Sequence, residues 1–146
     1  MEKSWEFRHI GVVVRDMDKA VEYYQSLGIA TIAPEHTADN KSLDLMVYGK
    51  PADPRLKIKI RMVQIGPVTL ELLQPVEGES PHKEFLDSKG EGAHHIAFTV
   101  DDLEKERANL VEKGTPIMLT RKDQDSFAYF DIRKVGNIVI ELIQRR

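Results

Sequence analysis

The sequence has no cysteine, a single tryptophan and no long run of apolar residues. Without a thiol, the chain can form neither a disulfide nor a thiolate metal site nor a catalytic cysteine, so any metal must be bound by imidazole and carboxylate groups. No apolar run approaches the ~20 residues of a membrane-spanning helix. The N-terminal stretch MEKSWEFRH has no apolar core of signal-peptide length. We therefore expect a cytoplasmic protein that does not act on a membrane.

The chain also lacks a strong excess of charge, because 21 Lys and Arg residues are balanced by 24 Asp and Glu to give a net charge of −3. This balance argues against a large nucleic-acid-binding surface. Hydrophobic residues make up 41% of the chain and charged residues 31%, as in an ordinary globular domain. The length of 146 residues fits one domain, and we predict a single domain that covers residues 1–146.

What the chain does contain is an internal repeat. The segment RHIGVVVRDMDKAVEYYQSLG aligns without a gap with HHIAFTVDDLEKERANLVEKG at a constant offset of 86 residues, which matches His9 with His95. A second pair, VTLELLQ and IVIELIQ, aligns at an offset of 70 and matches Glu71 with Glu141. Each half of the chain therefore begins with a histidine-led apolar segment and ends with an apolar segment that carries a glutamate.

The two offsets define the limits of the repeat. The units cover about residues 7–75 and 93–146 and are joined by residues 76–92. The first unit is longer by 16 residues, the difference between 86 and 70, and we place this extra length in the polar region from His36 to Arg55.

Local patterns predict a similar order of elements in each half. Alternating, β-rich segments predict strands at 9–14, 56–65, 68–73, 127–130 and 137–143. Helical spacing predicts a helix from Asp16 to Gly28 and a second that begins at a capping box of Asp101 and Glu104 and ends at Gly114, with a short third helix at Ser80–Leu86. We predict an α+β fold of two tandem βαβββ units that form an open, cleft-like mixed sheet with helices on the outer face.

The repeat gives special weight to His9, Glu71, His95 and Glu141. A pseudo-twofold axis between the halves would bring them together, and a carboxylate in an apolar strand is costly to bury unless it is paired or binds a metal. Two imidazoles and two carboxylates suit Mn, Fe, Co, Ni or Zn, with water completing six-coordination. We therefore predict a divalent metal site, although a single such residue on a strand more often faces solvent.

The remaining histidines have no such role in the prediction. His94 precedes His95 on the same strand, and neighbouring side chains on a strand point to opposite faces, so His94 is expected to face solvent or a neighbouring loop. His36 and His82 have no partner in the other half of the repeat and are interpreted as surface residues.

Three further features have open interpretations. Arg55, Lys57, Lys59 and Arg61 share one strand face, which favours a solvated edge over an anion site. A two-residue turn at Gly66-Pro67 would pair Met62 with Glu71 and turn this basic face away from the cleft. Tyr129 and Asp131 lie close enough to the last glutamate strand to face the cleft.

At the repeated His and Glu residues the sequence resembles the vicinal oxygen chelate superfamily, which includes glyoxalase I, methylmalonyl-CoA epimerase, extradiol dioxygenases and antibiotic-resistance proteins. The resemblance covers nearly the whole chain. It implies one His and one Glu ligand from each half, which correspond to His9, Glu71, His95 and Glu141 here, and it implies a homodimer.

The central block ELLQP…ESPHKEFLDSKGEGAHHIAFTVDDLE resembles the methylmalonyl-CoA epimerase branch most. This resemblance implies a small-molecule substrate such as a CoA thioester, whose α-proton is exchanged while the metal stabilises an enolate, with Glu141 as a catalytic base. One departure matters, because the position of the second catalytic glutamate of these epimerases holds Arg55, and Asp53 is the nearest carboxylate.

Two other functions stay open at this point. A glyoxalase I-type lyase would use the same four ligands on a hemithioacetal, although the usual approach to the last glutamate strand differs. A non-catalytic binding or resistance protein is the third possibility, and the complete ligand set argues against it. The substrate and the identity of the metal are not defined by the sequence.

Overall fold

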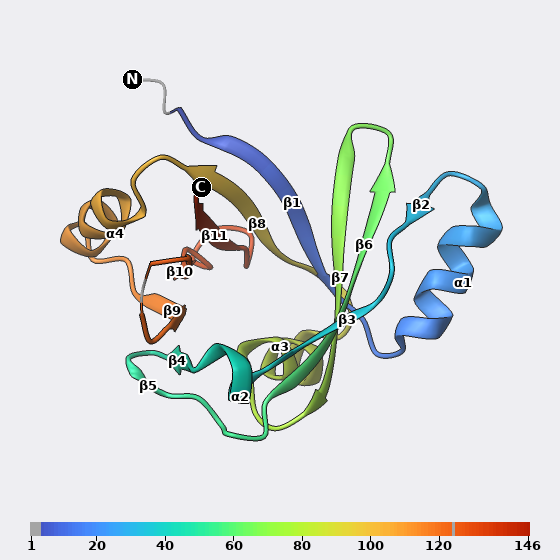
Figure 1. Cartoon of the computed structure of the whole chain (residues 1–146), viewed down its shortest axis with the longest axis horizontal. Helices are drawn as coiled ribbons and strands as arrows, with labels where there is room; N and C mark the ends of the chain where they lie inside the picture. The colour runs from blue at the N-terminus through green and yellow to red at the C-terminus, as the bar shows by residue number, and fades with distance from the viewer. Residues whose placement is uncertain (1–3, 124) are drawn as a thin grey trace.

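The computed structural model describes residues 4–123 and 125–146, and Figure 1 shows their arrangement. In chain order the elements are β1 (Glu6–Val13), α1 (Met17–Leu27), β2 (Thr31–Ile32), β3 (His36–Asp39), α2 (Asn40–Leu43), β4 (Leu45–Val47), β5 (Lys50–Pro51), β6 (Lys57–Ile65), β7 (Val68–Glu77), α3 (Pro81–Lys89), β8 (Gly92–Val100), α4 (Leu103–Glu112), β9 (Ile117–Arg121), β10 (Phe127–Asp131) and β11 (Val139–Gln144). Among the described residues, no helix is long and apolar enough to span a membrane.

One mixed sheet runs in the order β2-β6-β7-β1-β8-β11-β10-β9-β4-β5, with β3 also paired to β6. The two repeat-equivalent strands β1 and β8 are antiparallel neighbours at its centre, and each has its own glutamate strand, β7 or β11, parallel on the other side. Ile10 faces its repeat equivalent Ile96 across this central pair, which places the pseudo-twofold axis there. The predicted α+β architecture is confirmed, and α1 and α4 lie outside the curved sheet (Figure 1).

Both repeat helices begin at an aspartate and pack an apolar face on the sheet. The Asp16 carboxylate accepts a hydrogen bond from the Lys19 N–H, and Gly28 ends the helix with a left-handed φ of 67°. The equivalent cap of α4 is Asp102, so the prediction of Asp101 was wrong. The Asp101 carboxylate lies outside the helix and binds the Arg145 guanidinium instead.

The extra residues of the first half cross to the second half. The region between residues 36 and 55 forms β3, α2, β4 and β5, and β4 pairs with β9 of the other unit. Sequence patterns placed the insertion correctly but predicted neither β9 nor this pairing. The crossing brings residues of both halves together, and Leu45, Leu56 and Leu119 pack in the same apolar cluster.

Two β-bulges interrupt the central strand pair at equivalent places. On β1, Phe7 faces Phe98 and His9 faces Ala97, which leaves Arg8 without a partner. On β8, His95 faces Gly11 and Ala93 faces Val12, which leaves His94 without a partner. A bulge breaks the strict alternation of side chains and bends the strand. Each bulge residue directly precedes the histidine that the repeat singles out.

The predicted register of the β6–β7 hairpin is confirmed, since Ile65 faces Val68 and Met62 faces Glu71. However, β6 is not an edge strand, because β2 and β3 both pair with it. The basic side chains on β6 are partly buried, and the Arg61 Nε donates a hydrogen bond to the Ala33 carbonyl oxygen. The expectation of a solvated edge is therefore wrong for this strand.

Candidate metal centre

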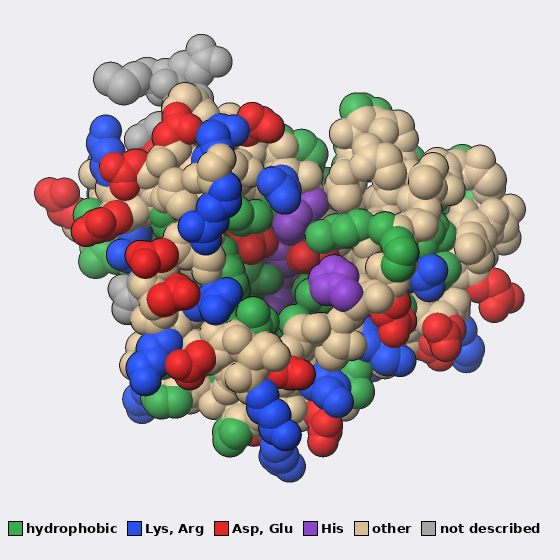
Figure 2. Space-filling model, viewed as in Figure 1, with side chains coloured by type: hydrophobic (Ala, Val, Ile, Leu, Met, Phe, Trp, Pro, Cys, Tyr) green, Lys and Arg blue, Asp and Glu red, His purple; other side chains and the backbone are tan. Residues whose placement is uncertain are grey.

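The four residues matched by the repeat lie together at the middle of the sheet. His9 and His95 come from the central strands β1 and β8, and Glu71 and Glu141 come from β7 and β11 beside them. His9, His95 and Glu141 are buried, and the Glu71 side chain is 12% exposed. Figure 2 shows histidine and acidic side chains gathered in the hollow between the two halves of the molecule.

Sheet register explains why these side chains meet. Gly11 faces Glu71 in the parallel pair of β1 and β7, and Ala97 faces Glu141 in the pair of β8 and β11. Both positions hold a very small residue beside a glutamate. A Cβ atom at Gly11 would overlap the His95 imidazole, so the absence of a side chain there makes room for this ring.

Four side-chain atoms converge on one point. The Nε2 atoms of His9 and His95 are 3.4 Å apart, and Glu71 Oε1 lies 3.3 Å from the former and 3.2 Å from the latter. Glu141 Oε1 lies 3.3 Å from each Nε2 atom. Nitrogen and oxygen donors that lie about 2.0–2.2 Å from one ion are separated from their neighbours by roughly 3.0–3.5 Å. These separations have the spacing of ligands around one small cation.

The electrostatics of the centre also suit a cation. Burial opposes the charge on Glu71, but its contacts with His9 and His95 outweigh burial and lower the pKa of this carboxyl below its usual range. For the same reason the pKa of Glu141 is lowered. Burial alone would lower the pKa of His9, yet Glu141 and Glu71 raise it to about 9. Both carboxylates are therefore ionised at neutral pH.

One atom of the centre has no hydrogen bond. Glu141 Oε1 is fully buried and no described residue donates to it with suitable geometry. An unpaired buried carboxylate oxygen is costly, and a cation between the four donors would remove this cost. The donor set, its spacing and this oxygen fit a divalent metal ion such as Co, Mn, Ni, Zn or Fe. That the four residues bind one stays a prediction.

A second group of histidines lies behind the first. His94 is only 3% exposed, and its Nδ1 lies 3.0 Å from Nδ1 of His95. The expectation that His94 faces solvent or a loop is therefore wrong, because the bulge at His94 breaks the alternation on which it rested. Ligand histidines usually hydrogen-bond through their second ring nitrogen, and His94 is the partner of His95 in this sense.

His82 completes this second group and was also predicted wrongly. It lies in the first turn of α3, is 2% exposed and places its Nε2 3.0 Å from the Tyr129 hydroxyl. His36, by contrast, is exposed as predicted. The spacing of His82 and Leu86, four residues apart on the buried face of α3, is the sequence signal that could have placed His82 inside.

The centre borders a small apolar cavity of about 160 Å³. The polar residues in its wall are Glu71, Glu141, His82 and Tyr129, and the rest of the wall is Ala38, Leu43, Leu45, Leu56, Ile58, Ile60, Leu73, Leu119 and Phe127. Tyr129 thus faces the cleft, whereas the Asp131 carboxylate is bound by the Arg133 guanidinium. The crossing segment of the first half supplies much of the apolar wall.

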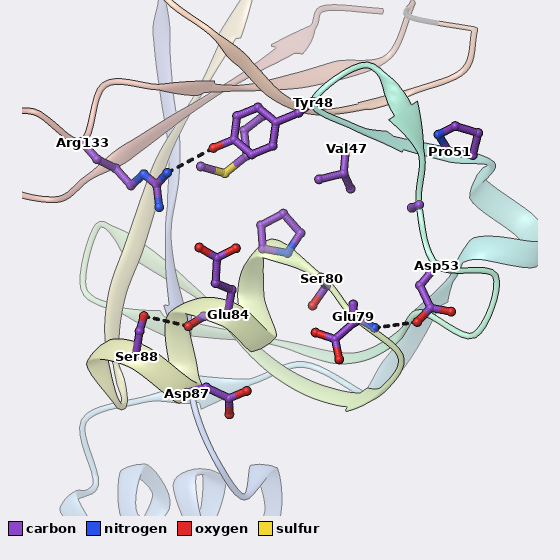
Figure 3. A pocket seen from close by; sticks show the side chains of 13 residues that line it. Val47, Tyr48, Pro51, Asp53, Glu79, Ser80, Glu84, Asp87, Ser88 and Arg133 are labelled. Carbon is purple, nitrogen blue, oxygen red and sulfur yellow. Dashed lines mark hydrogen bonds between the residues drawn. The ribbon is translucent and has the colours of Figure 1, made fainter.

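Asp53 does not contribute to this cavity. It lines a different pocket of about 480 Å³ together with Glu79, Glu84 and Arg133, which Figure 3 shows from close by. Its carboxylate accepts hydrogen bonds from the backbone N–H groups of Glu79 and Arg55, and these lower its pKa. The carboxylate nearest to the position of the missing second base therefore stabilises a loop through these hydrogen bonds and does not face the metal centre.

Comparison with known proteins assigns the family. Residues 8–130 match the model of the glyoxalase/bleomycin resistance protein/dioxygenase superfamily, and the chain belongs to this superfamily. The match spans both halves of the repeat and confirms the resemblance stated from the sequence.

Two relatives are similar to the chain in sequence. The chain is 26% identical over 141 residues to the uncharacterized protein YqjC of Bacillus subtilis, covering 93% of this chain and 89% of that protein. It is 28% identical over 112 residues to the mitochondrial methylmalonyl-CoA epimerase of Bos taurus, covering 75% of this chain and 55% of the relative. The chain thus spans about half the length of the mitochondrial epimerases that it matches.

Solved structures share the fold. A hypothetical protein of Bacillus halodurans C-125 superposes with a TM-score of 0.71 at 24% identity, over 99% of this chain and 96% of the other. The methylmalonyl-CoA epimerase of Mycobacterium tuberculosis gives 0.70 at 19% identity, over 100% and 93%. The epimerase of Streptomyces coelicolor, solved with 2-nitronate-propionyl-CoA, gives 0.65 at 21% identity, over 95% and 96%.

Proposed function

We propose that the chain is a metal-dependent isomerase or epimerase that exchanges the α-proton of a small acyl substrate. One observation carries the proposal: four charged or imidazole donors converge at 3.2–3.4 Å on the wall of a small apolar cavity. The similarity to methylmalonyl-CoA epimerases supports a CoA thioester as the substrate class.

His9, Glu71, His95 and Glu141 would hold the ion. A divalent cation supplies Lewis-acid stabilisation of the negative charge that develops on the substrate carbonyl oxygen. The Glu141 carboxylate removes the α-proton, and the C–H electron pair moves into the carbonyl to give the enolate. Return of a proton to the same carbon completes the exchange. The apolar residues on the cavity side of the centre lower the local dielectric constant, which strengthens these electrostatic interactions.

The test is incubation of the protein with methylmalonyl-CoA in D2O, with and without added Co²⁺, followed by mass spectrometry of the substrate. We expect metal-dependent uptake of one deuterium at the α-carbon, and loss of this exchange in Glu141→Gln. Lys122→Gln, on the surface, serves as the matched control. No deuterium uptake with a metal-loaded protein would exclude the epimerase version.

Glyoxalase I-type chemistry is the second candidate, because the matched superfamily includes it and the same four donors would serve it. Product formation from methylglyoxal and a thiol by the same metal-loaded protein would favour it. Failure to bind any divalent metal would leave a non-catalytic binding protein. The homodimer implied by the resemblance is tested separately by light scattering.

A further inference from the structure

The wall of the cavity beside the proposed metal centre includes two polar side chains that have no role in the proposed function. Tyr129 and His82 line it together with the two glutamates, and all its other wall residues are apolar. A cavity of this size, about 160 Å³, resembles the ~150 Å³ cavities that hold a benzene-sized ligand.

Tyr129 is fixed beside the metal centre. On β10 it faces Glu141 of β11 across the sheet, and its ring lies 4.8 Å from the His95 ring, centroid to centroid. Its side chain is 4% exposed. The hydroxyl oxygen lies 3.0 Å from Nε2 of His82, which α3 presents from its first turn. Packing and this hydrogen bond hold the hydroxyl in one place.

The direction of this hydrogen bond follows from the other ring nitrogen. His82 Nδ1 is fully buried, and none of the described residues pairs with it. If Nε2 accepted the phenol proton, Nδ1 would carry a buried hydrogen with no acceptor, and orphaned buried N–H donors are rare. In the alternative tautomer the His82 Nε2–H donates to the phenol oxygen, and the bare Nδ1 needs no acceptor. The O–H of Tyr129 is then free to donate into the cavity.

We propose that the Tyr129 hydroxyl, positioned by His82, donates a hydrogen bond to an oxygen of the bound substrate beside the metal centre. The site would then select a short acyl group that keeps an oxygen acceptor free beside the ion that the two histidines and two glutamates would hold, as a malonyl-type group does. This inference rests on the proposed function for the location of the substrate. Tyr129 also gives the cleft a second polar contact, on the strand beside Glu141.

The test uses two small chelators on Co²⁺-loaded protein and needs no turnover. Malonate can bind the ion through two oxygens and keeps two further acceptor oxygens, whereas acetylacetone binds through two oxygens and has none left. We expect Tyr129→Phe to weaken malonate binding roughly 10-fold or more, as for loss of a hydrogen bond to a charged acceptor, and to leave acetylacetone binding unchanged. Titrations followed by the Co²⁺ absorption spectrum measure both affinities.

His82 variants separate positioning from a general loss of structure. His82→Leu is expected to weaken malonate binding, and His82→Gln, which keeps an N–H donor for the phenol oxygen, is expected to restore most of it. Unchanged Co²⁺ stoichiometry in each variant shows that the metal centre is intact.

The results distinguish this inference from the proposed function. Selective loss of malonate affinity in Tyr129→Phe without any α-deuteration of thioesters supports the contact and refutes the epimerase. Equal malonate affinity in wild type and Tyr129→Phe overturns the contact even if deuteration is observed. A wild-type protein that binds Co²⁺ but no malonate, or that binds no Co²⁺ at all, also overturns it.

Discussion

Substitution of Gly11 by alanine probes the geometry of the centre with a single methyl group. Gly11 is not needed for its backbone angle, since it is absent from the residues with positive φ, so alanine is compatible with the strand. The added Cβ would overlap the His95 imidazole, which is 0% exposed. Overpacking of this kind costs about 1–3 kcal/mol. Because the displaced ring is a proposed ligand, we expect metal affinity to fall by more than the roughly 10–100-fold that loss of a ligand's supporting partner causes.

The assay is a competition titration of Co²⁺ against a chromophoric chelator, with circular dichroism to confirm the fold. The matched control is Ala97→Gly at the repeat-equivalent position, which removes a methyl group beside Glu141 and should leave metal affinity within about 10-fold. The reasoning is refuted if Gly11→Ala folds and binds Co²⁺ as tightly as the wild type, since His95 could then not be the ligand that the register places there.

Three further predictions concern the histidines. His94→Ala should weaken Co²⁺ binding about 10–100-fold, because His94 supports His95 through its Nδ1 contact, while His36→Ala on the surface should have no effect; equal titrations would contradict the contact. The metal-free protein should lose stability from about pH 6.5 to pH 9, because the pKa of His9 is raised to about 9 and its favourable protonation is lost over this window, as thermal unfolding at a series of pH values will show. Saturating Co²⁺, at 100 times its Kd, should stabilise the fold by about 2.7 kcal/mol at pH 7 and should remove this decline in stability. A melting temperature that is the same with and without Co²⁺ would contradict both expectations.

Much of this centre is visible in the sequence, because duplication places the same residue types at matched positions. Two gap-free alignments, at offsets of 86 and 70 residues, match His9 with His95 and Glu71 with Glu141, and the twofold relation of the halves then brings them together. Local patterns do not define distant partners, however. Nothing in the short β4 segment at Leu45–Val47 indicates that it pairs with the second half, since hydrogen bonding between strands depends on tertiary context.

The doubled histidine shows a different limit. Strict alternation predicts opposite faces for His94 and His95, and a β-bulge at this point buries both. Arg8 and His94 are matched in the repeat, but this match identifies them as the two bulge residues only when the strand pairing is known. The burial of His82 was not predicted, because a histidine at such a position on a short helix can be either exposed or buried. Its burial follows from the packing of α3 against β8 and Tyr129, which the sequence does not show.

Metal stoichiometry tests the central claim most directly. The chelator-treated protein is dialysed against excess Co²⁺, and bound metal per chain is measured by inductively coupled plasma mass spectrometry for the wild type and for the double variant His9→Ala/His95→Ala, with His36→Ala as the control. We predict one Co²⁺ per chain in the wild type and the control and none in the double variant. No bound Co²⁺ in the wild type, or equal amounts in all three proteins, would contradict a metal centre formed by His9, Glu71, His95 and Glu141.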